Sequence, residues 1–156
     1  MNVAVVDYDA GNTLSVTRAL EKVGAKVDLT PDPERVARAD AVVLPGVGAF
    51  GDCVRKLGER GMDDACRVVF EAGRPFLGVC VGLQVLFEGS EESPGVKGLG
   101  ILPGTVRRFR VGDLKVPHMG WNELNVRREH PVLEVRTARL STSCIPTTRS
   151  RGRRRI

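Results

Sequence analysis

Four short apolar segments alternate with segments of helical pattern, and this alternation limits the possible folds more than any other feature of the sequence. The apolar segments are rich in valine and too short for buried helices, which is typical of strands covered on both faces. They comprise residues 2–8, 25–30, 41–46 and 75–79. Because strands that alternate with helices form βαβ units, we predict an α/β fold with a mostly parallel central sheet and helices on both faces.

Further predictions concern the elements around and after this sheet. Residues 13–23 have the clearest helical pattern, with Asn12 or Thr13 as the cap. The apolar stripe of this helix comprises Leu14, Val16, Ala19, Leu20 and Val23. Residues 81–88 begin a further helix. From about Val96 the sequence changes to Gly/Pro turns and short strands, which favours an antiparallel or mixed edge of the sheet in the second half.

The composition indicates a cytoplasmic protein with free thiols. No apolar run approaches the ~20 residues of a membrane span, and the N-terminus lacks the basic leader of a signal peptide. The four cysteines include no CxxC pair, and only two histidines accompany them, which leaves little from which to build a zinc site. We therefore expect no metal and no cofactor.

The positive net charge of the chain lies entirely after Glu134. Residues 135–156 contain seven arginines and no acidic residue, whereas residues 1–134 carry 17 basic and 19 acidic side chains. The composition of the body therefore gives no reason to expect nucleic-acid binding, despite the arginine-rich tail. The tail also lacks strand alternation and a usable helical stripe. We accordingly divide the chain into a domain of residues 1–134 and a basic tail of residues 135–156.

The segment Gly78-Val79-Cys80-Val81-Gly82 places a cysteine between two glycines at a predicted strand-to-helix corner. This spacing is typical of a nucleophile elbow, in which small neighbours leave the nucleophile exposed at the carboxyl end of a strand. The start of a helix also favours the reactive thiolate, and the N–H of Val81 is placed to stabilise an oxyanion. The alternative is a buried, inert cysteine. We favour that alternative for Cys53, Cys66 and Cys144, and predict that Cys80 is a nucleophile.

Two further segments are candidates for the same site. Gln84 lies one helical turn after Cys80, where a neutral amide suits the positioning of a polar substrate. Pro45-Gly46-Val47-Gly48 ends the third predicted strand, and therefore can face the elbow across the sheet. Its glycines permit unusual backbone angles, so backbone N–H groups near Val47 and Gly48 are candidates for a second oxyanion donor. A plain turn is an equal alternative for this segment.

Three motifs, in this order, resemble those of the class I (triad) glutamine amidotransferases. They are LPGVGAF at residues 44–50, GVCVGLQVLFEGSEE at residues 78–92 and VPHMGWN at residues 116–122. Within that family the combination is most similar to the glutaminase subunits of imidazole glycerol phosphate synthase, from histidine biosynthesis. The resemblance runs from residue 1 to about residue 134, and implies a flavodoxin-like sheet.

The resemblance also implies a reaction and a partner. Cys80 would attack the side-chain amide of glutamine, ammonia would leave, and water would hydrolyse the γ-glutamyl thioester to glutamate. The ammonia would pass to a (β/α)8-barrel cyclase subunit that closes the imidazole ring, in a heterodimer. Gly46, Gln84 and Glu92 match positions that bind the substrate, and residues 45–48 match an oxyanion strand. The face that docks on the barrel is matched by His118, Met119, Trp121 and Asn122. For Trp121 a plain core position is the alternative.

The chain departs from the family pattern at the other two members of the triad. The family supplies a histidine base and an orienting glutamate as His-x-Glu near the C-terminus. Neither His118 nor His130 is followed two residues later by glutamate. Deprotonation of water and protonation of the leaving amine would then lack an agent. We therefore expect negligible glutaminase turnover from this chain.

Several interpretations of the tail and of the function are open. The tail, residues 135–156, results from a frameshift after Glu134, which we favour, or is a disordered basic segment that binds nucleic acid or an acidic partner. A third interpretation is a truncated homologue that keeps docking but not catalysis. For the function, the alternatives to a glutaminase subunit are a non-catalytic docking subunit of the synthase and another cysteine-elbow hydrolase.

Overall fold

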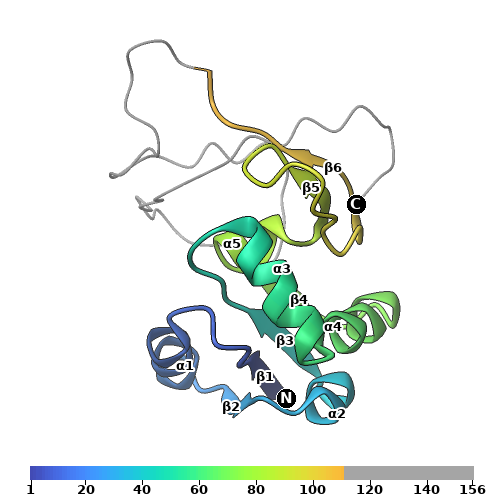
Figure 1. Ribbon diagram of the computed structural model, residues 1–156. Helices are drawn as coiled ribbons and strands as arrows, with labels where there is room; N and C mark the ends of the chain where they lie inside the picture. Colours follow the sequence, from blue (N-terminus) through green and yellow to red (C-terminus); the bar gives the residue numbers. More distant parts are fainter. Residues whose placement is uncertain (111–156) are drawn as a thin grey trace, which may run out of the picture. The chain divides into compact units, whose positions relative to one another are not determined.

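The computed structural model describes residues 1–110 of the chain (Figure 1). Residues 1–108 belong to one compact unit, which contains every helix and strand named below. Among the described residues, no helix combines the length and the hydropathy that a membrane crossing requires. Several sequence predictions lie outside the described residues, namely those for His118, Met119, Trp121, Asn122, His130, Cys144 and the tail.

A sheet of four parallel strands confirms the predicted fold class. The strands are β1 (Asn2–Val6), β2 (Lys26–Thr30), β3 (Ala41–Leu44) and β4 (Phe76–Gly78). Their order is β2-β1-β3-β4, with which flavodoxin-like sheets begin. β1 and β3 are buried on both faces, which explains why their sequences are almost continuous runs of valine, alanine and leucine.

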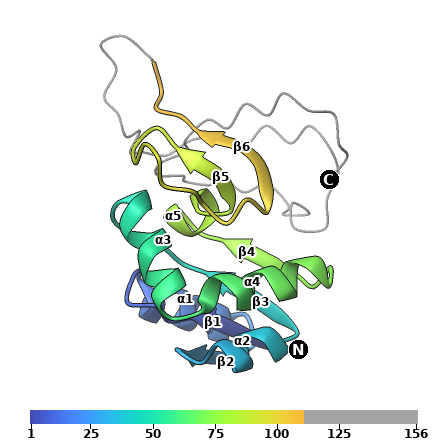
Figure 2. The same cartoon turned by 45° about the vertical axis from the view of Figure 1, so that its right-hand side comes forward.

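Helices cover both faces of this sheet, as the alternating pattern predicts (Figures 1 and 2). On one face, α1 (Thr13–Lys22) packs through Val16 and Leu20 against a cluster formed by β1 and β3. On the other face lie the helices α2 (Pro33–Arg38), α3 (Phe50–Glu59) and α4 (Met62–Glu71). The larger core therefore lies between the sheet and α2, α3 and α4.

The predicted apolar stripe of α1 is wrong at Leu14, Ala19 and Val23, all of which are exposed. Asn12 caps this helix, since its side-chain oxygen accepts a hydrogen bond from the N–H of Ser15 at 3.2 Å. However, Leu14 is 56% exposed and Val23 is 80% exposed. The reason is that α1 meets the sheet along one narrow line of residues four positions apart, Val16 and Leu20, so apolar residues beside that line remain in solvent.

The helix predicted for residues 81–88 is much shorter than expected. α5 (Val81–Gln84) is a single turn, and residues Phe87–Ser90 form the strand β5. Contacts distant in sequence end the helix: the carbonyls of Val85 and Leu86 accept hydrogen bonds from the N–H groups of Leu99 (2.7 Å) and Leu102 (2.9 Å). These acceptors are therefore used to build the following sheet, instead of continuing the helix.

The predicted antiparallel edge of the sheet is also wrong for the residues that the structure describes. β5 pairs in parallel with β6 (Leu102–Val106), and the two form a separate two-stranded sheet. Within residues 1–110, antiparallel pairing is limited to an isolated bridge between Gly89 and Lys97. The part of that prediction that concerns residues 111–134 lies outside the described residues.

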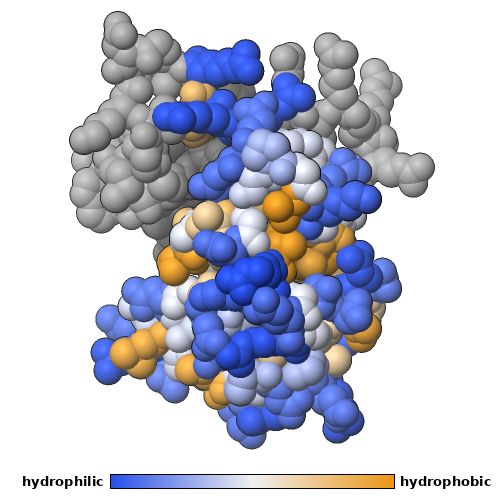
Figure 3. Space-filling model, in the orientation of Figure 1, coloured by the Kyte–Doolittle hydropathy of each residue, from blue (hydrophilic) through white to orange (hydrophobic). Residues whose placement is uncertain are grey.

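The segment around β5 and β6 shares the core of the larger sheet. Leu86 and Leu99 are buried in the same cluster as the helices α3 and α4, and Ile101 packs against it. On the face shown in Figure 3, polar residues cover most of the helices, and apolar residues gather where the β5–β6 part meets them. The residues of the elbow and of the following strands are therefore held by one continuous core.

Candidate active site

Cys80 lies at a strained corner between β4 and α5. Its backbone has φ 56° and ψ −121°, and it precedes the first residue of α5 as the N-cap. Among the described residues, only Asp9 shares a positive φ without being glycine. Such angles are sparsely populated by residues with a side chain, and persist only where the surroundings hold them. The Cys80 side chain is exposed, so the corner presents a thiol to solvent, as the spacing of its glycines predicts.

The two glycines that flank this corner are required by close backbone packing. A Cβ atom at Gly82 would collide with the carbonyl oxygen of Leu44, at the end of β3. A Cβ atom at Gly78 would lie 2.6 Å from the Cα atom of Leu83. Neither position can therefore hold a larger residue without movement of the backbone. The sequence argument that the neighbours of the nucleophile must be small is confirmed at both positions.

The segment 45–48 contacts the elbow directly. A Cβ atom at Gly46 would collide with the backbone nitrogen of Gly82 and would lie 2.9 Å from the carbonyl carbon of Val81. Val47 is 53% exposed, and Gly48 has φ +93° with open space where a side chain would be. The sequence prediction that this segment faces the elbow across the sheet is therefore confirmed, because β3 and β4 are neighbouring parallel strands.

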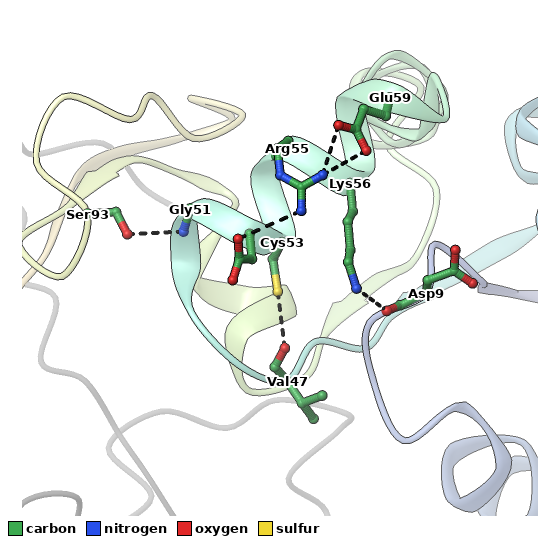
Figure 4. A network of polar contacts seen from close by, with 9 residues as sticks. Asp9, Val47, Gly51, Cys53, Arg55, Lys56, Glu59 and Ser93 are labelled. Carbon is green, nitrogen blue, oxygen red and sulfur yellow. Dashed lines mark hydrogen bonds and ion pairs between the residues drawn. The ribbon is translucent and has the colours of Figure 1, made fainter.

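Two buried side chains donate hydrogen bonds to this segment from the core. The hydroxyl of Tyr8 donates to the carbonyl of Pro45 at 2.7 Å. The thiol of Cys53 donates to the carbonyl of Val47 at 3.4 Å, a contact that Figure 4 shows. Both side chains are fully buried. Burial raises the pKa of each group, so both keep their protons at neutral pH. The two donors thus hold both ends of the segment.

The N–H of Val81 is available at the corner. Within residues 1–110 it makes no hydrogen bond, whereas the next three N–H groups bond to the carbonyls of Val79 and Cys80 at 3.0–3.3 Å. An unpaired N–H beside an exposed thiol has the chemistry of an oxyanion donor. The structure therefore brings three parts of the predicted site close together: the elbow, the segment 45–48 and the Val81 N–H.

Gln84 and Glu92 lie in different surroundings. Gln84 is half-buried at the end of α5, and its N–H donates to the carbonyl of Cys80 at 3.3 Å, one turn earlier. Glu92 is exposed, and one of its carboxylate oxygens accepts a hydrogen bond from the N–H of Phe50 at 3.0 Å. Part of the Glu92 carboxylate is therefore engaged at the start of α3. Among residues 1–110, no cluster of acidic, histidine and cysteine side chains is suited to hold a metal ion.

Most of the chain matches a known protein family. The model "Glutamine amidotransferase class-I" matches residues 4–152. This chain belongs to the class I glutamine amidotransferase family. The matched range runs past Glu134, where the sequence motifs of the resemblance end.

Similar curated proteins are named as subunits of one synthase. "Imidazole glycerol phosphate synthase subunit HisH" of Nitrosococcus oceani is 53% identical over 135 residues, which cover 84% of this chain and 64% of that protein. The subunit of the same name from Thermus thermophilus is 52% identical over 124 residues, or 80% of this chain and 62% of that protein. The chain therefore spans less than two thirds of the length of these relatives.

A solved structure supports the same family assignment. A crystal structure described as a glutamine amidotransferase is 25% identical to this chain, with a TM-score of 0.59. The match covers 70% of this chain and 58% of the other. The parallel sheet is therefore part of an α/β arrangement that this glutamine amidotransferase shares.

Sequence reasoning missed the residues that support this amidotransferase site. α3 begins at Phe50 without a side-chain cap from Ala49, and its first N–H groups are instead satisfied by Glu92 and by the hydroxyl of Ser93, which accepts from Gly51 at 3.1 Å. The one available signal was the absence of Ser, Thr, Asp and Asn from the four residues before Phe50. A helix without a local cap needs acceptors from elsewhere, but the sequence does not say from where.

The other end of α3 holds the loop that follows β1. Lys56 donates to the carbonyl of Asp9 at 2.6 Å, and Arg60 forms an ion pair with the carboxylate of Asp9. Figure 4 shows α3 with the Lys56–Asp9 contact, the Gly51–Ser93 contact and the Cys53–Val47 contact along its length. α3 therefore fixes three segments: residues 45–48, the loop after β1 and the loop after β5.

Proposed function

We propose that this protein is the glutaminase component of an imidazole glycerol phosphate synthase, and that Cys80 is the nucleophile that attacks glutamine. The observation that carries the proposal is the strained, exposed Cys80 corner in a member of the class I glutamine amidotransferase family. Beside it lies the Val81 N–H, which makes no hydrogen bond within residues 1–110. The relatives named as subunits of that synthase are about half identical to this chain, which supports the choice of substrate and pathway.

The proposed reaction begins with acylation of Cys80. The thiolate sulfur attacks the side-chain amide carbon of glutamine, and the carbonyl electron pair moves onto oxygen. The N–H of Val81 and the backbone N–H groups of Val47 and Gly48 stabilise this oxyanion. Collapse of the intermediate breaks the C–N bond, and the nitrogen leaves as ammonia once a general acid has given it a proton, a step for which residues 1–110 contain no histidine. Water then hydrolyses the γ-glutamyl thioester to release glutamate.

The remaining roles in the proposal concern binding of the substrate and the partner. Gly46, Gln84 and Glu92 hold the amino-acid end of glutamine, and the ammonia passes to a (β/α)8-barrel cyclase subunit. The motif of the docking face comprises His118, Met119, Trp121 and Asn122. The subunits in question act in histidine biosynthesis, and we place the heterodimer in the cytoplasm. The proposed chemistry involves no cofactor.

Turnover by this chain is expected to be negligible. Protonation of the leaving nitrogen and deprotonation of the hydrolytic water both need a group that transfers protons. Residues 1–110 contain no histidine, and neither His118 nor His130 occurs in a His-x-Glu sequence. An activated reagent can therefore still acylate Cys80, but Cys80 cannot hydrolyse glutamine repeatedly.

The proposal is tested by mixing the full chain with the barrel cyclase subunit of a synthase. We expect negligible release of glutamate from glutamine. A diazoketone analogue of glutamine should label Cys80 once per chain, and excess glutamine should protect it. Release of glutamate that Cys80→Ala abolishes would refute the expected inactivity. Labelling that glutamine does not slow would refute the proposed substrate.

A non-catalytic docking subunit is the second candidate, favoured by the absence of a His-x-Glu sequence from the chain. Capture of the cyclase subunit by the full chain, without production of ammonia, would support it. A different cysteine hydrolase would instead cleave small esters or amides repeatedly, without any partner. Labelling of Cys80 that glutamine slows therefore distinguishes the first function from the second, and repeated ester cleavage without the partner identifies the third.

A further inference from the structure

Two buried side chains lie under the segment 45–48, and the sequence motifs of the family do not include them. Tyr8 follows β1, and Cys53 lies in the first half of α3, so they reach the segment from different elements. We propose that Tyr8 and Cys53 are positioning residues that hold the backbone of this segment for oxyanion stabilisation. This inference rests on the proposed function, because both residues act only through the segment and its part in oxyanion stabilisation. Neither residue touches the substrate.

The two hydrogen bonds fix two of the three peptide groups between Pro45 and Gly48. Tyr8 holds the carbonyl of Pro45, and Cys53 holds the carbonyl of Val47. In a trans peptide the carbonyl and the N–H point in opposite directions. The N–H groups of Gly46 and Gly48 are therefore directed away from these two donors. The N–H of Val47 belongs to the peptide between two fixed neighbours.

The segment needs such support because its own residues do little to restrict its backbone conformation. Two of its four residues are glycines, which lose the most conformational freedom on ordering. Val47 is more than half exposed, and a Cβ atom at Gly48 would meet no neighbour. Without the two donors, the N–H groups would sample several directions, and stabilisation of an oxyanion depends on donors that are already aligned.

Cys53 is itself held firmly, as a positioning residue must be. It lies on α3, whose start is satisfied by Glu92 and Ser93 and whose later turns contact Asp9. The alternative is that Cys53 only fills core volume. Cys66 of α4 provides the matched control, because it is equally buried in the same cluster. Within residues 1–110, Cys66 makes no hydrogen bond to the segment.

The test compares two reactions of Cys80 in the full chain. With p-nitrophenyl acetate, the sulfur attacks the ester carbonyl and an oxyanion forms. The C–O bond then breaks, and p-nitrophenolate leaves with the electron pair and needs no proton. With iodoacetamide, the sulfur attacks the methylene carbon and iodide leaves, so no oxyanion forms. The ratio of the two rate constants reports oxyanion stabilisation, and subtraction of the rates of Cys80→Ala removes the reaction of other thiols.

We expect Cys53→Ala to lower the ester rate about tenfold, less than the ~100-fold cost of deleting an oxyanion donor outright. The iodoacetamide rate should stay within about twofold, because that reaction makes no use of the donors. Cys53→Ser should restore the ratio, since a hydroxyl also donates to the carbonyl of Val47. Tyr8→Phe should behave like Cys53→Ala, and Cys66→Ala should leave the ratio unchanged.

Each other outcome overturns a different claim. If Cys53→Ala and Cys66→Ala lower both rates equally, Cys53 is a packing residue and the inference fails, while Cys80 remains a nucleophile. If Cys80 of the unaltered chain reacts with neither reagent, the proposed function fails and the inference with it. Should Cys53→Ala not fold, Cys53→Ser and Tyr8→Phe still decide, because the inference requires a normal ratio in the first and a lowered ratio in the second.

Discussion

Cys80 combines an exposed thiol with backbone angles that few non-glycine residues adopt, φ 56° and ψ −121°. The surrounding contacts leave the chain little choice at this corner. The N–H of Val79 bonds to the carbonyl of Leu44 at 2.9 Å, and Gly82 lies directly against that same carbonyl. Contacts with the end of β3 on both sides of Cys80 therefore fix the backbone of the corner. The strained angles of Cys80 are the consequence.

Replacement of Gly82 tests this contact. We expect Gly82→Ala to destabilise the protein by about 3 kcal/mol, because an added Cβ collides with backbone that has no side-chain freedom with which to yield. Gly58→Ala is the control: Gly58 lies within α3, its nearest neighbour is 4.0 Å from the added Cβ, and the change should stabilise by about 0.5–1 kcal/mol. Urea unfolding measures both. Equal effects of the two changes would contradict the role assigned to Gly82.

Strain at Cys80 predicts that a side chain at this position lowers the stability of the fold. Cys80→Gly and Cys80→Ala both remove the thiol, but only glycine relieves the positive φ. We expect the glycine variant to be more stable than the alanine variant by about 1 kcal/mol, the lower end of the cost of such angles. Thermal unfolding of the two variants side by side measures the difference. A more stable alanine variant would show that the corner is unstrained.

At the scale of elements, α3 shows how a helix depends on distant residues. It has no local N-cap, and its first N–H groups donate to Glu92 and Ser93, each 42 residues later in the chain than its donor. Its other contacts reach residues 45–48 and Asp9. Loss of either end of α3 would therefore disturb the support of the elbow as well as the helix.

Removal of one cap tests this dependence. Ser93→Ala should cost about 1 kcal/mol, the usual effect of losing a side-chain oxygen at a helix start. Ser15→Ala is the control, because Ser15 is exposed on α1 and only its backbone N–H is used in capping. Urea unfolding measures both. If the two variants unfold alike, the Ser93 hydroxyl does not contribute to α3.

Sequence reasoning succeeded where burial alone determines composition. β1 and β3 are covered on both faces, so their residues are apolar throughout and identify them. It failed where partners distant in sequence decide the structure. The carbonyls of Val85 and Leu86 bond to residues of the 99–102 segment, and no local pattern at residues 81–88 reveals that. The hydrogen bonds of Tyr8 and Cys53 were not predicted for the same reason, because each joins two different elements.

At the scale of the whole molecule, the elbow depends on a core that contains several titratable groups. Tyr8, Cys53 and Cys66 are all fully buried in the same cluster as the elements that form the corner. Burial raises the pKa of Tyr8 and of Cys53, and raises the pKa of Cys66 to about 12. Because burial disfavours the charged forms, the fold is coupled to pH on the alkaline side.

The direction of that coupling follows from the protons held by each state. Below about pH 9 the three groups are protonated in both states, so they add no pH dependence. Above about pH 9 the unfolded chain releases the thiol protons, whereas the folded chain keeps them. The free energy of unfolding should then fall by about 1.4 kcal/mol per pH unit for each such group. For Cys66 this range extends from pH 9 to about pH 12.

A pair of core truncations in α4 separates this effect from ordinary packing. Cys66→Ala and Val69→Ala both remove atoms of fully buried side chains in the same cluster, and both should lower stability at about pH 7. Only Cys66→Ala removes a titratable group, so its stability should fall less steeply above about pH 9 than that of Val69→Ala. Urea unfolding at intervals between about pH 7 and about pH 10.5 measures the two slopes. Parallel slopes would show that the Cys66 thiol ionises equally well in both states. That result would contradict the burial of Cys66 in the core that also holds the elements of the elbow.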